Sequence, residues 1–453
     1  MKKLLLFVLT IHCSLVTIHC ISQSCLPDSI IFTTQTQIDS FQINYPNCSE
    51  IEGNVTIIGD DLINLHGLSV LTSIGGDFHF LSHSSTLTNL TGLDALTSIE
   101  GDFIFSWFSS PLTNLTGLDS LTYIGGNFQF VCANTTLTNL MELNSLTSIG
   151  GDFYFNCSNT PLTNLEGLGA LTSIGKEFHL SGSCLNSLTG LNSLTSIGGD
   201  VTLYHQYSLP DYTGLEALTS IGGSINVWGS RLVDLTGLSS LTSLGGLDLG
   251  GNVHLASLSG LETLTTISGS IIILSCDSLN SLSALENITS IGGRLTFDRN
   301  NGLTSLTGLE NIDPFSIDSL SIIFNDNLAT CEVKSICDYL VNPVGSIEIH
   351  DNAAGCNSSM EVDTACAQLS IPDINFESNV LIYPNPADDI LTISCKNETT
   401  IEEVVIYNQL GSRVFERELP NSTINLSNLK QGIYIIEFTS KKMKSRQKLI
   451  IKE

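Results

Sequence analysis

The chain has 453 residues, a formal net charge of −28 at pH 7 and charged side chains at only 14% of its positions. A chain of this length exceeds the usual size of one compact core, so it folds either as several domains or as a stack of repeats. So negative a surface repels phosphate groups, which argues against nucleic acid or an anionic membrane as a partner.

The negative charge is confined to one part of the chain. Residues 22–370 contain 5 Lys and Arg against 34 Asp and Glu, whereas residues 371–453 contain 10 against 11. This division predicts an acidic module followed by a nearly neutral one with a different role.

The first 24 residues have the pattern of a secretory signal peptide. Lys2 and Lys3 precede an apolar run from Leu4 to Ile21, and small residues follow at Ser22 and Ser24. We expect export and removal of residues 1–24, and no membrane-spanning segment in the mature chain. Of the 13 cysteines, two fall in the signal, and the other eleven can form disulfides in an oxidising compartment.

A repeat of 23–25 residues occupies the centre of the chain. The string Leu-Thr-Ser-Ile-Gly-Gly recurs, in places degenerate, and its Ile, once replaced by Leu, marks the register. The marked positions are Ile74, Ile99, Ile124, Ile149, Ile174, Ile197, Ile221, Leu244, Ile267 and Ile291. This period predicts a solenoid, because one copy cannot bury its apolar face alone and stacked copies can.

Each copy contains two apolar rhythms. Just after the Gly pair, alternate residues such as Phe103 and Phe105 are apolar, which predicts a short strand with both side chains inward. Before the pair, every third residue is apolar, as at Leu112, Leu115 and Leu118, which is typical of a corner made of 3₁₀ or extended pieces. We expect the Gly pair to adopt positive φ at the corner before the strand. The fold class is therefore mainly β, a solenoid of about 11 coils with one parallel sheet.

Cysteines mark both ends of this array, where open coils would expose apolar faces and sheet edges. The candidate disulfide cysteines are Cys25 and Cys48 before the first coil, and Cys331, Cys337, Cys356 and Cys366 after the last. The last four allow three pairings, which the sequence does not rank. They surround an expected amphipathic helix at 332–340. Cys132 and Cys157 lie one repeat apart, so they form either a further disulfide or a ladder of free thiols.

Several of these motifs resemble a known family. The opening segment 37–48, the coil Gly-Leu-x-x-Leu-Thr-Ser-Ile-Gly-Gly and the cysteine-rich close are similar to the receptor L domain, a right-handed β-solenoid related to leucine-rich repeats. The resemblance covers about residues 25–368, with caps at 25–50 and 328–368. It implies the fold and no particular ligand, since the ligand contacts of that family are not a fixed motif.

A second module follows an expected linker at 369–379. Alternating apolar runs at 389–393, 404–408 and 432–438, with Gly411 at a hairpin turn, predict a small β-sandwich over residues 380–453. Tyr-Pro-Asn-Pro at 383–386, Ile-Tyr-Asn-x-x-Gly at 406–411 and Gly-x-Tyr-x-x-x-Phe at 432–438 resemble the C-terminal sorting domain of the bacterial type IX secretion system. The resemblance implies a host in the Bacteroidota, the export machinery as a partner, and release from or attachment to the outer cell surface.

The outward strand positions vary from coil to coil, as a recognition face or an unconstrained surface would. Aromatic residues near them are candidates for binding a glycan or a partner protein, the alternative being scattered surface aromatics. The candidates are Trp107, Phe108, Tyr154, Tyr204, Tyr207 and Trp228.

A column of acidic and amide residues precedes the strands. Its members are Asp77, Asp102, Asn127, Asp152, Glu177 and Asp200. Calcium could bridge stacked carboxylates, but Asp and Asn also suit a turn after the Gly pair, and the β-roll calcium signature is absent. We therefore expect no cofactor.

No Ser-His-Asp set, acid pair or phosphate-binding loop convincingly breaks the repeat, so the sequence predicts no catalytic or metal site. We expect a secreted or cell-surface, non-enzymatic adhesion protein that binds glycan or protein through its solenoid face. The alternatives are a structural scaffold of the cell surface and, more remotely, a polysaccharide-degrading enzyme, which would need a pocket with two carboxylates.

Overall fold

The computed structural model describes two compact units, divided after Cys366. The described residues are 23–82, 86–109, 111–182, 184–369, 380–395, 401–409, 411–418, 423–440 and 443–452. All but the last two residues of the expected signal and all but the first residue of the expected linker lie outside these ranges.

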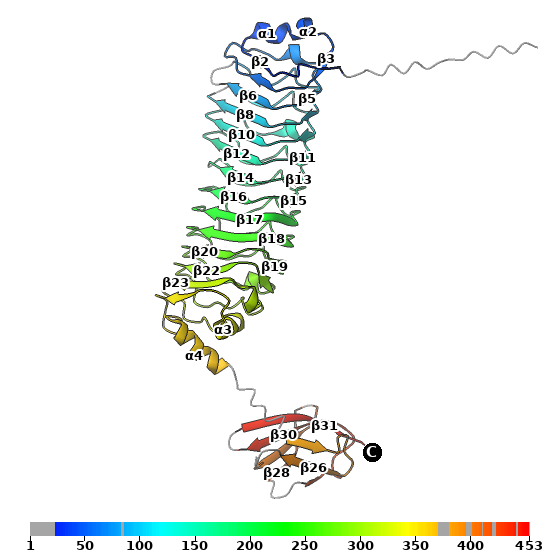
Figure 1. Cartoon of the computed structure of the whole chain (residues 1–453), viewed down its shortest axis with the longest axis vertical. Coiled ribbons are helices and arrows are strands. Elements are labelled where there is room, and N and C mark those ends of the chain that lie inside the picture. The colour runs from blue at the N-terminus through cyan, green and yellow to red at the C-terminus, as the bar shows by residue number, and fades with distance from the viewer. Residues whose placement is uncertain are drawn as a thin grey trace, which may run out of the picture. The chain divides into compact units, whose positions relative to one another are not determined.

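The first unit is a β-solenoid of about 13 turns, drawn in Figure 1 as two stacks of strands, one long and one short. Strands in neighbouring coils pair in parallel and in register, as Phe103, Phe128 and Phe153 do. The count exceeds the expected 11 because coils at both ends lack the Leu-Thr-Ser-Ile-Gly-Gly string, so the repeat alone does not reveal them.

The long strands carry the outward face of the sheet. They are β2 (Ile30–Phe32), β4 (Val55–Ile57), β6 (Phe78–Ser82), β8 (Phe103–Phe108), β10 (Phe128–Ala133), β12 (Phe153–Ser158), β14 (Phe178–Ser181), β16 (Val201–Tyr204), β17 (Ser220–Trp228), β18 (Ser243–Gly250), β20 (Ile271–Leu274), β22 (Arg294–Asp298), β23 (Ser319–Ile323) and β24 (Ile347–His350).

The short strands lie at the Ser-Ile of the repeat and, at the start, in the first cap. They are β1 (Gln23–Cys25), β3 (Cys48–Ile51), β5 (Ser73–Ile74), β7 (Ser98–Ile99), β9 (Tyr123–Ile124), β11 (Ser148–Ile149), β13 (Ser173–Ile174), β15 (Ser196–Ile197), β19 (Thr266–Ile267) and β21 (Ser290–Ile291). Strands β17 and β18 are long enough to run through both positions.

The core consists of columns of equivalent residues, as both rhythms predict. Phe105, Phe130 and Phe155 stack with ring centroids 4.7 and 5.5 Å apart, and Leu112 and Leu115 of the period-three segment are fully buried. Short 3₁₀ turns form this corner in some coils, namely η1 (His66–Leu68), η2 (Met141–Leu143), η3 (Ser283–Leu285) and η4 (Pro314–Ser316). Each buried Leu or Phe contributes roughly 1.5–3 kcal/mol to stability.

The expectation of positive φ at the Gly pair is wrong. Positive φ occurs instead at the glycine of Thr-Gly-Leu, for example Gly117 with φ 114°. The pair is needed for close approach between coils, because a Cβ on Gly126 would overlap the Asp102 carboxylate and lie 2.6 Å from the Gly101 carbonyl carbon. A further left-handed corner, after the long strand, falls on residues such as Asn134 and Asn159.

The acidic column is a hydrogen-bonded ladder between coils, which we call the Asp/Asn ladder. The Asp102 Oδ1 accepts from the Asn127 backbone N–H (2.7 Å), and the Asn127 Oδ1 accepts from the Asp152 N–H (2.7 Å). The same bond joins Asn54 to Asp77 and Asp77 to Asp102. The second glycine of the pair, as at Gly76, Gly126, Gly151 and Gly223, therefore leaves the space that this carboxylate or amide fills.

Both ends are closed by helices and disulfides. The first cap holds α1 (Gln35–Asp39), α2 (Phe41–Asn44) and the Cys25–Cys48 disulfide, and the last holds α3 (Lys334–Val341) and α4 (Ser359–Leu369). The pairings left open by the sequence are Cys331–Cys356 and Cys337–Cys366, and Cys132–Cys157 is a fourth disulfide. The helix expected at 332–340 is α3.

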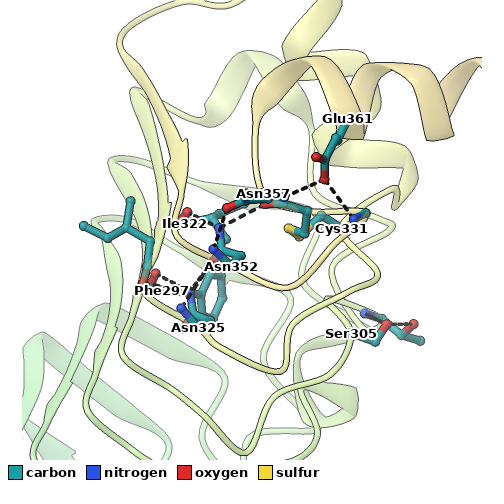
Figure 2. Close-up of a disulfide and its surroundings, with 12 residues drawn as sticks. Phe297, Ser305, Ile322, Asn325, Cys331, Asn352, Asn357 and Glu361 are labelled. Atoms are coloured by element: carbon teal, nitrogen blue, oxygen red, sulfur yellow. Dashed lines mark hydrogen bonds between the residues drawn. A yellow bond between two sulfur atoms is a disulfide. The ribbon is translucent and has the colours of Figure 1, made fainter.

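Asparagines support the last coils from within, as Figure 2 shows beside the Cys331–Cys356 disulfide. The Asn325 Nδ2 donates to the Phe297 carbonyl (3.1 Å) and the Asn352 Nδ2 to the Ile322 carbonyl (2.7 Å). The Asn325 N–H donates to the Asn352 Oδ1 (3.0 Å), so the coils are joined by side chains as well as by strand pairing.

The second unit contains two antiparallel sheets. One pairs β25 (Val380–Tyr383), β26 (Ile390–Cys395) and β29 (Thr423–Asn425), and the other pairs β28 (Arg413–Glu418), β27 (Glu403–Tyr407), β30 (Gly432–Ser440) and β31 (Met443–Ile451). Gly411 has φ 77° in the turn between β27 and β28, as its hairpin position predicts. Asn385 of the Tyr-Pro-Asn-Pro segment holds β31, since its Nδ2 donates to the Lys448 carbonyl (2.7 Å) and its Oδ1 accepts from the Ile450 N–H (2.9 Å).

We expect the Gly126→Ala substitution to destabilise the solenoid by about 1–3 kcal/mol, because the added methyl overlaps the Asp102 carboxylate and the Gly101 backbone. Gly169→Ala is the matched control, since no atom lies within 4 Å of its added Cβ. Urea unfolding followed by circular dichroism measures both. Equal midpoints for the two variants would contradict the close-packing role.

We expect Tyr212→Phe to raise stability by about 1 kcal/mol. Tyr212 stands where most coils have a buried Leu, and its hydroxyl is buried without a hydrogen-bond partner. Tyr339→Phe is the matched comparison and should cost about 1 kcal/mol, because its equally buried hydroxyl accepts from the Gly345 N–H (3.2 Å). Thermal unfolding measures the difference, and a loss in the Tyr212 variant would refute this reading.

Candidate functional site

Four aromatic side chains lie on the outward face of neighbouring long strands, in two register positions that are two residues apart along the strands. They are Tyr154 on β12, His179 on β14, Tyr204 on β16 and Trp228 on β17, and we call them the aromatic row. The Tyr154 and His179 rings stack at 4.8 Å with an interplanar angle of 18°, and the His179 and Tyr204 rings lie 5.7 Å apart. Tyr204 and Trp228 are register partners on neighbouring strands. The row therefore crosses four successive coils.

A glycine in the next coil makes room for the end of the row. Gly250 on β18 is the register partner of Trp228, and a Cβ at this position would lie 2.7 Å from the Trp228 Cδ2. The indole therefore lies across the neighbouring strand. Tyr204 and Trp228 keep 40% and 37% of their surface exposed, so both rings remain accessible to a ligand.

Polar groups fix and flank the aromatic row. The Tyr154 hydroxyl accepts weak hydrogen bonds from the Asn156 Nδ2 and the Ser181 Oγ, each at 3.4 Å. Asn226 lies on β17 beside the row and donates from its Nδ2 to the Asp200 carboxylate (3.1 Å). Exposed rings bordered by amide and hydroxyl groups are the chemistry that binds sugars, whose faces are apolar and whose edges carry hydroxyls.

A pocket of about 370 Å³ opens at the Tyr154 end of the row. Its lining residues are Asn127, Gln129, Asp152, Tyr154, Glu177 and His179. The Asp152 Oδ1 accepts a hydrogen bond from the Glu177 backbone N–H (3.0 Å) as part of the Asp/Asn ladder. Glu177 is the one ladder member among these with a longer side chain, and its exposed carboxylate lines the pocket. Partial burial lowers the pKa of His179, so its imidazole is neutral at neutral pH.

The six aromatic residues that the sequence predicts as a ligand face do not all lie on one surface. Tyr154, Tyr204 and Trp228 fall in the aromatic row. Tyr207 is exposed in the loop after β16, with its ring 6.0 Å from that of His205. Phe108 is half-buried at the end of β8, on the outward side of that strand.

Trp107 does not belong to an exposed face. It is fully buried and stacks on Phe80 at 4.7 Å and on Phe105 at 5.4 Å. The alternation that places Phe103 and Phe105 inward continues to Trp107. This pattern could have excluded Trp107 from the candidate ligand face. Sequence reasoning also omitted His179 from the candidates, although it stands one repeat of 25 residues after Tyr154.

The ladder carboxylates of Asp77, Asp102, Asp152 and Asp200 each accept a hydrogen bond from a backbone N–H of the next coil. Within the described ranges, no group of three or more His, Cys, Asp or Glu side chains is arranged to hold a metal ion. The same ranges contain no helix with the length and apolar character needed to cross a membrane.

The second unit has a recognisable family. Residues 381–452 match the model of the secretion system C-terminal sorting domain. The C-terminal unit is a type IX sorting domain. The protein is therefore secreted or attached to the outer cell surface, and the sorting domain makes the type IX secretion machinery its partner in export.

Three curated proteins share part of the sequence. An endo-acting ulvan lyase of Formosa agariphila is 41% identical over 81 residues, which is 17% of this chain and 15% of that protein. An ulvan lyase of Nonlabens ulvanivorans is 30% identical over 131 residues, 28% and 24% of the two chains. Beta-agarase D of Zobellia galactanivorans is 32% identical over 104 residues, 22% and 21%. The chain thus spans less than a quarter of the length of each.

These relatives contradict the prediction that the protein is not an enzyme, since they are named as polysaccharide lyases and an agarase. The prediction rested on finding no residues that break the repeat. Glu177, His179 and Tyr154 do vary from coil to coil at their positions, and the fold gathers them in one pocket. The pocket joins the ladder position and the outward strand position of neighbouring coils, two positions that the sequence analysis treats separately.

We expect deletion of residues 381–453 to abolish export. The truncated chain should remain in the periplasm of a bacterium that has the type IX system, because the sorting domain is what the machinery recognises. Cell fractionation with surface proteolysis measures this, and the intact chain in a strain lacking the system is the control. Surface display of the truncated chain would contradict the assignment.

Proposed function

We propose that the solenoid is a polysaccharide-binding module of a secreted or surface-attached protein, and that the aromatic row is its binding face. The observation that carries this is the continuity of Tyr154, His179, Tyr204 and Trp228 across four coils, with Gly250 leaving space for the indole. Partly exposed aromatic rings, bordered by amides and hydroxyls, fit a sugar chain better than a flat protein surface.

Only part of the ligand face predicted from the sequence belongs to the proposed binding face. Tyr207 lies near the row and can extend it, whereas Phe108, on β8, belongs to a coil outside the row. We also propose that the mature chain begins at residue 25, with residues 25–368 as a receptor L domain-like binding unit and residues 380–453 as the export unit. The repeat string and the cysteine-rich caps support the first of these units.

A second candidate function is cleavage of the bound polysaccharide in the pocket beside the row. Asp152, Glu177, His179 and the Tyr154 hydroxyl meet there, and the relatives named above are lyases and an agarase. The Glu177 carboxylate makes no hydrogen bond or ion pair within the described part of the chain, so it is open to contact with a bound sugar. A neutral His179 can also accept a proton.

We expect Trp228→Ala and Tyr204→Ala to weaken glycan binding about tenfold each, which corresponds to the loss of about 1.4 kcal/mol of ring contact. A glycan array followed by titration calorimetry measures this on the mature protein. Tyr123→Ala is the matched control, since Tyr123 is 37% exposed but lies on the short strand β9.

Saturable binding that is weakened about tenfold in both row variants and unchanged in the control is the expected outcome. A blank across all glycans would contradict the proposal and favour a structural role at the cell surface. Release of shorter chains from a bound polymer, abolished by Glu177→Gln with binding retained, would establish the second candidate as well.

A further inference from the structure

We infer that the ligand is a linear, uncharged polysaccharide that lies along the solenoid axis, with one sugar ring over each of the four coils of the aromatic row. This inference rests on the proposed function and adds the direction, the length and the charge class of the bound chain.

The direction follows from the register of the coils. Neighbouring strands of a sheet are about 4.8 Å apart, and the row has one aromatic ring per strand, from β12 to β17. His179 pairs with Thr202 rather than with Tyr204, so the row crosses the strands obliquely and moves two residues along them between His179 and Tyr204. The Tyr154–His179 and His179–Tyr204 ring distances of 4.8 and 5.7 Å match this step. One pyranose unit of an extended chain advances by about one such step, so a chain crossing the strands can place successive rings on successive coils.

The length follows from where the row ends. On one side, Gln129 on β10 replaces the aromatic ring with an amide, and it lines the pocket next to Tyr154. On the other side, the Trp228 indole covers Gly250 of β18, where the fifth coil offers no side chain. The row therefore has four aromatic rings, enough to contact four successive sugars. A fifth sugar of the same chain would reach the pocket.

The charge class follows from the carboxylates around the platform. Asp152 and Glu177 line the pocket. Asp200 lies on the coil of Tyr204, and Asp248 lies on the coil that follows Trp228. No Lys or Arg lines the pocket, and residues 22–370 contain 34 acidic against 5 basic residues. This field repels sulfate and uronate groups. The amides and hydroxyls of Gln129, Asn156 and Ser181 instead match sugar hydroxyls, which both donate and accept.

The test uses the full mature protein and oligosaccharides of two to seven units from neutral glucans, xylans and galactans, with sulfated and uronate chains of equal length. Titration calorimetry at low salt should show affinity rising with each added ring up to four or five and then levelling. Charged chains should bind at least tenfold more weakly, and added salt should narrow this difference because it screens the repulsion.

Truncating the end of the row sharpens the test. Trp228→Ala should bind a trimer as well as the unmodified protein does but lose the gain from the fourth ring, whereas Tyr123→Ala should change neither. Binding without length dependence beyond two rings, or preference for the charged chains, would overturn the inference while leaving the proposed function intact. Failure to bind any glycan of any length would overturn both.

Discussion

The register between neighbouring coils is the constraint on which the rest of this structure depends. It is held by strand pairing, by glycines that let one backbone approach the next, and by Asp and Asn side chains that accept a backbone N–H from the following coil, as Asp102 does from Asn127. Because each side-chain oxygen is bound to a particular N–H, slipping by one residue would break the ladder and turn the Phe columns outward.

Because the register is fixed, outward residues that differ from coil to coil lie side by side on the surface of the solenoid. Inward positions must repeat Phe, Leu or Ile to fill the columns, but outward positions such as Tyr154 and His179 are free to differ, and equivalent residues are brought within one strand spacing of each other. A rigid one-dimensional stack therefore presents its outward side chains as rows. The pocket lies where the Asp/Asn ladder has the longer side chain of Glu in place of Asp or Asn. There the Glu177 carboxylate lies beside His179 and Tyr154.

The caps and the sorting domain fit this design. A stack is stable only if its end coils are covered, and helices α1 to α4 with three disulfides cover them. An acidic, disulfide-containing solenoid joined to a type IX sorting domain is suited to the cell exterior, where disulfides persist. The separate, nearly neutral charge of the second unit agrees with a role in export rather than in recognition.

Most of the fold was predictable because its determinants are local and periodic. The Phe alternation, the period-three leucines, the cap cysteines and Gly411 each act within a few residues. The number of coils was underestimated because the end coils lack the full repeat string, and the Gly pair was misread because its role depends on the Asp102 carboxylate of another coil. Trp107 was misplaced because its alternation was not followed far enough. The aromatic row was not predicted because its two halves stand at different register positions, two residues apart along the strands. The pocket was not predicted because it joins two different positions of three neighbouring coils.

A crystal structure of the mature protein with a bound neutral oligosaccharide tests the central claim most directly. The account predicts a sugar chain that crosses β12, β14, β16 and β17 and contacts Tyr154, His179, Tyr204 and Trp228. A chain lying parallel to the strands, or bound on the short-strand side, would contradict it.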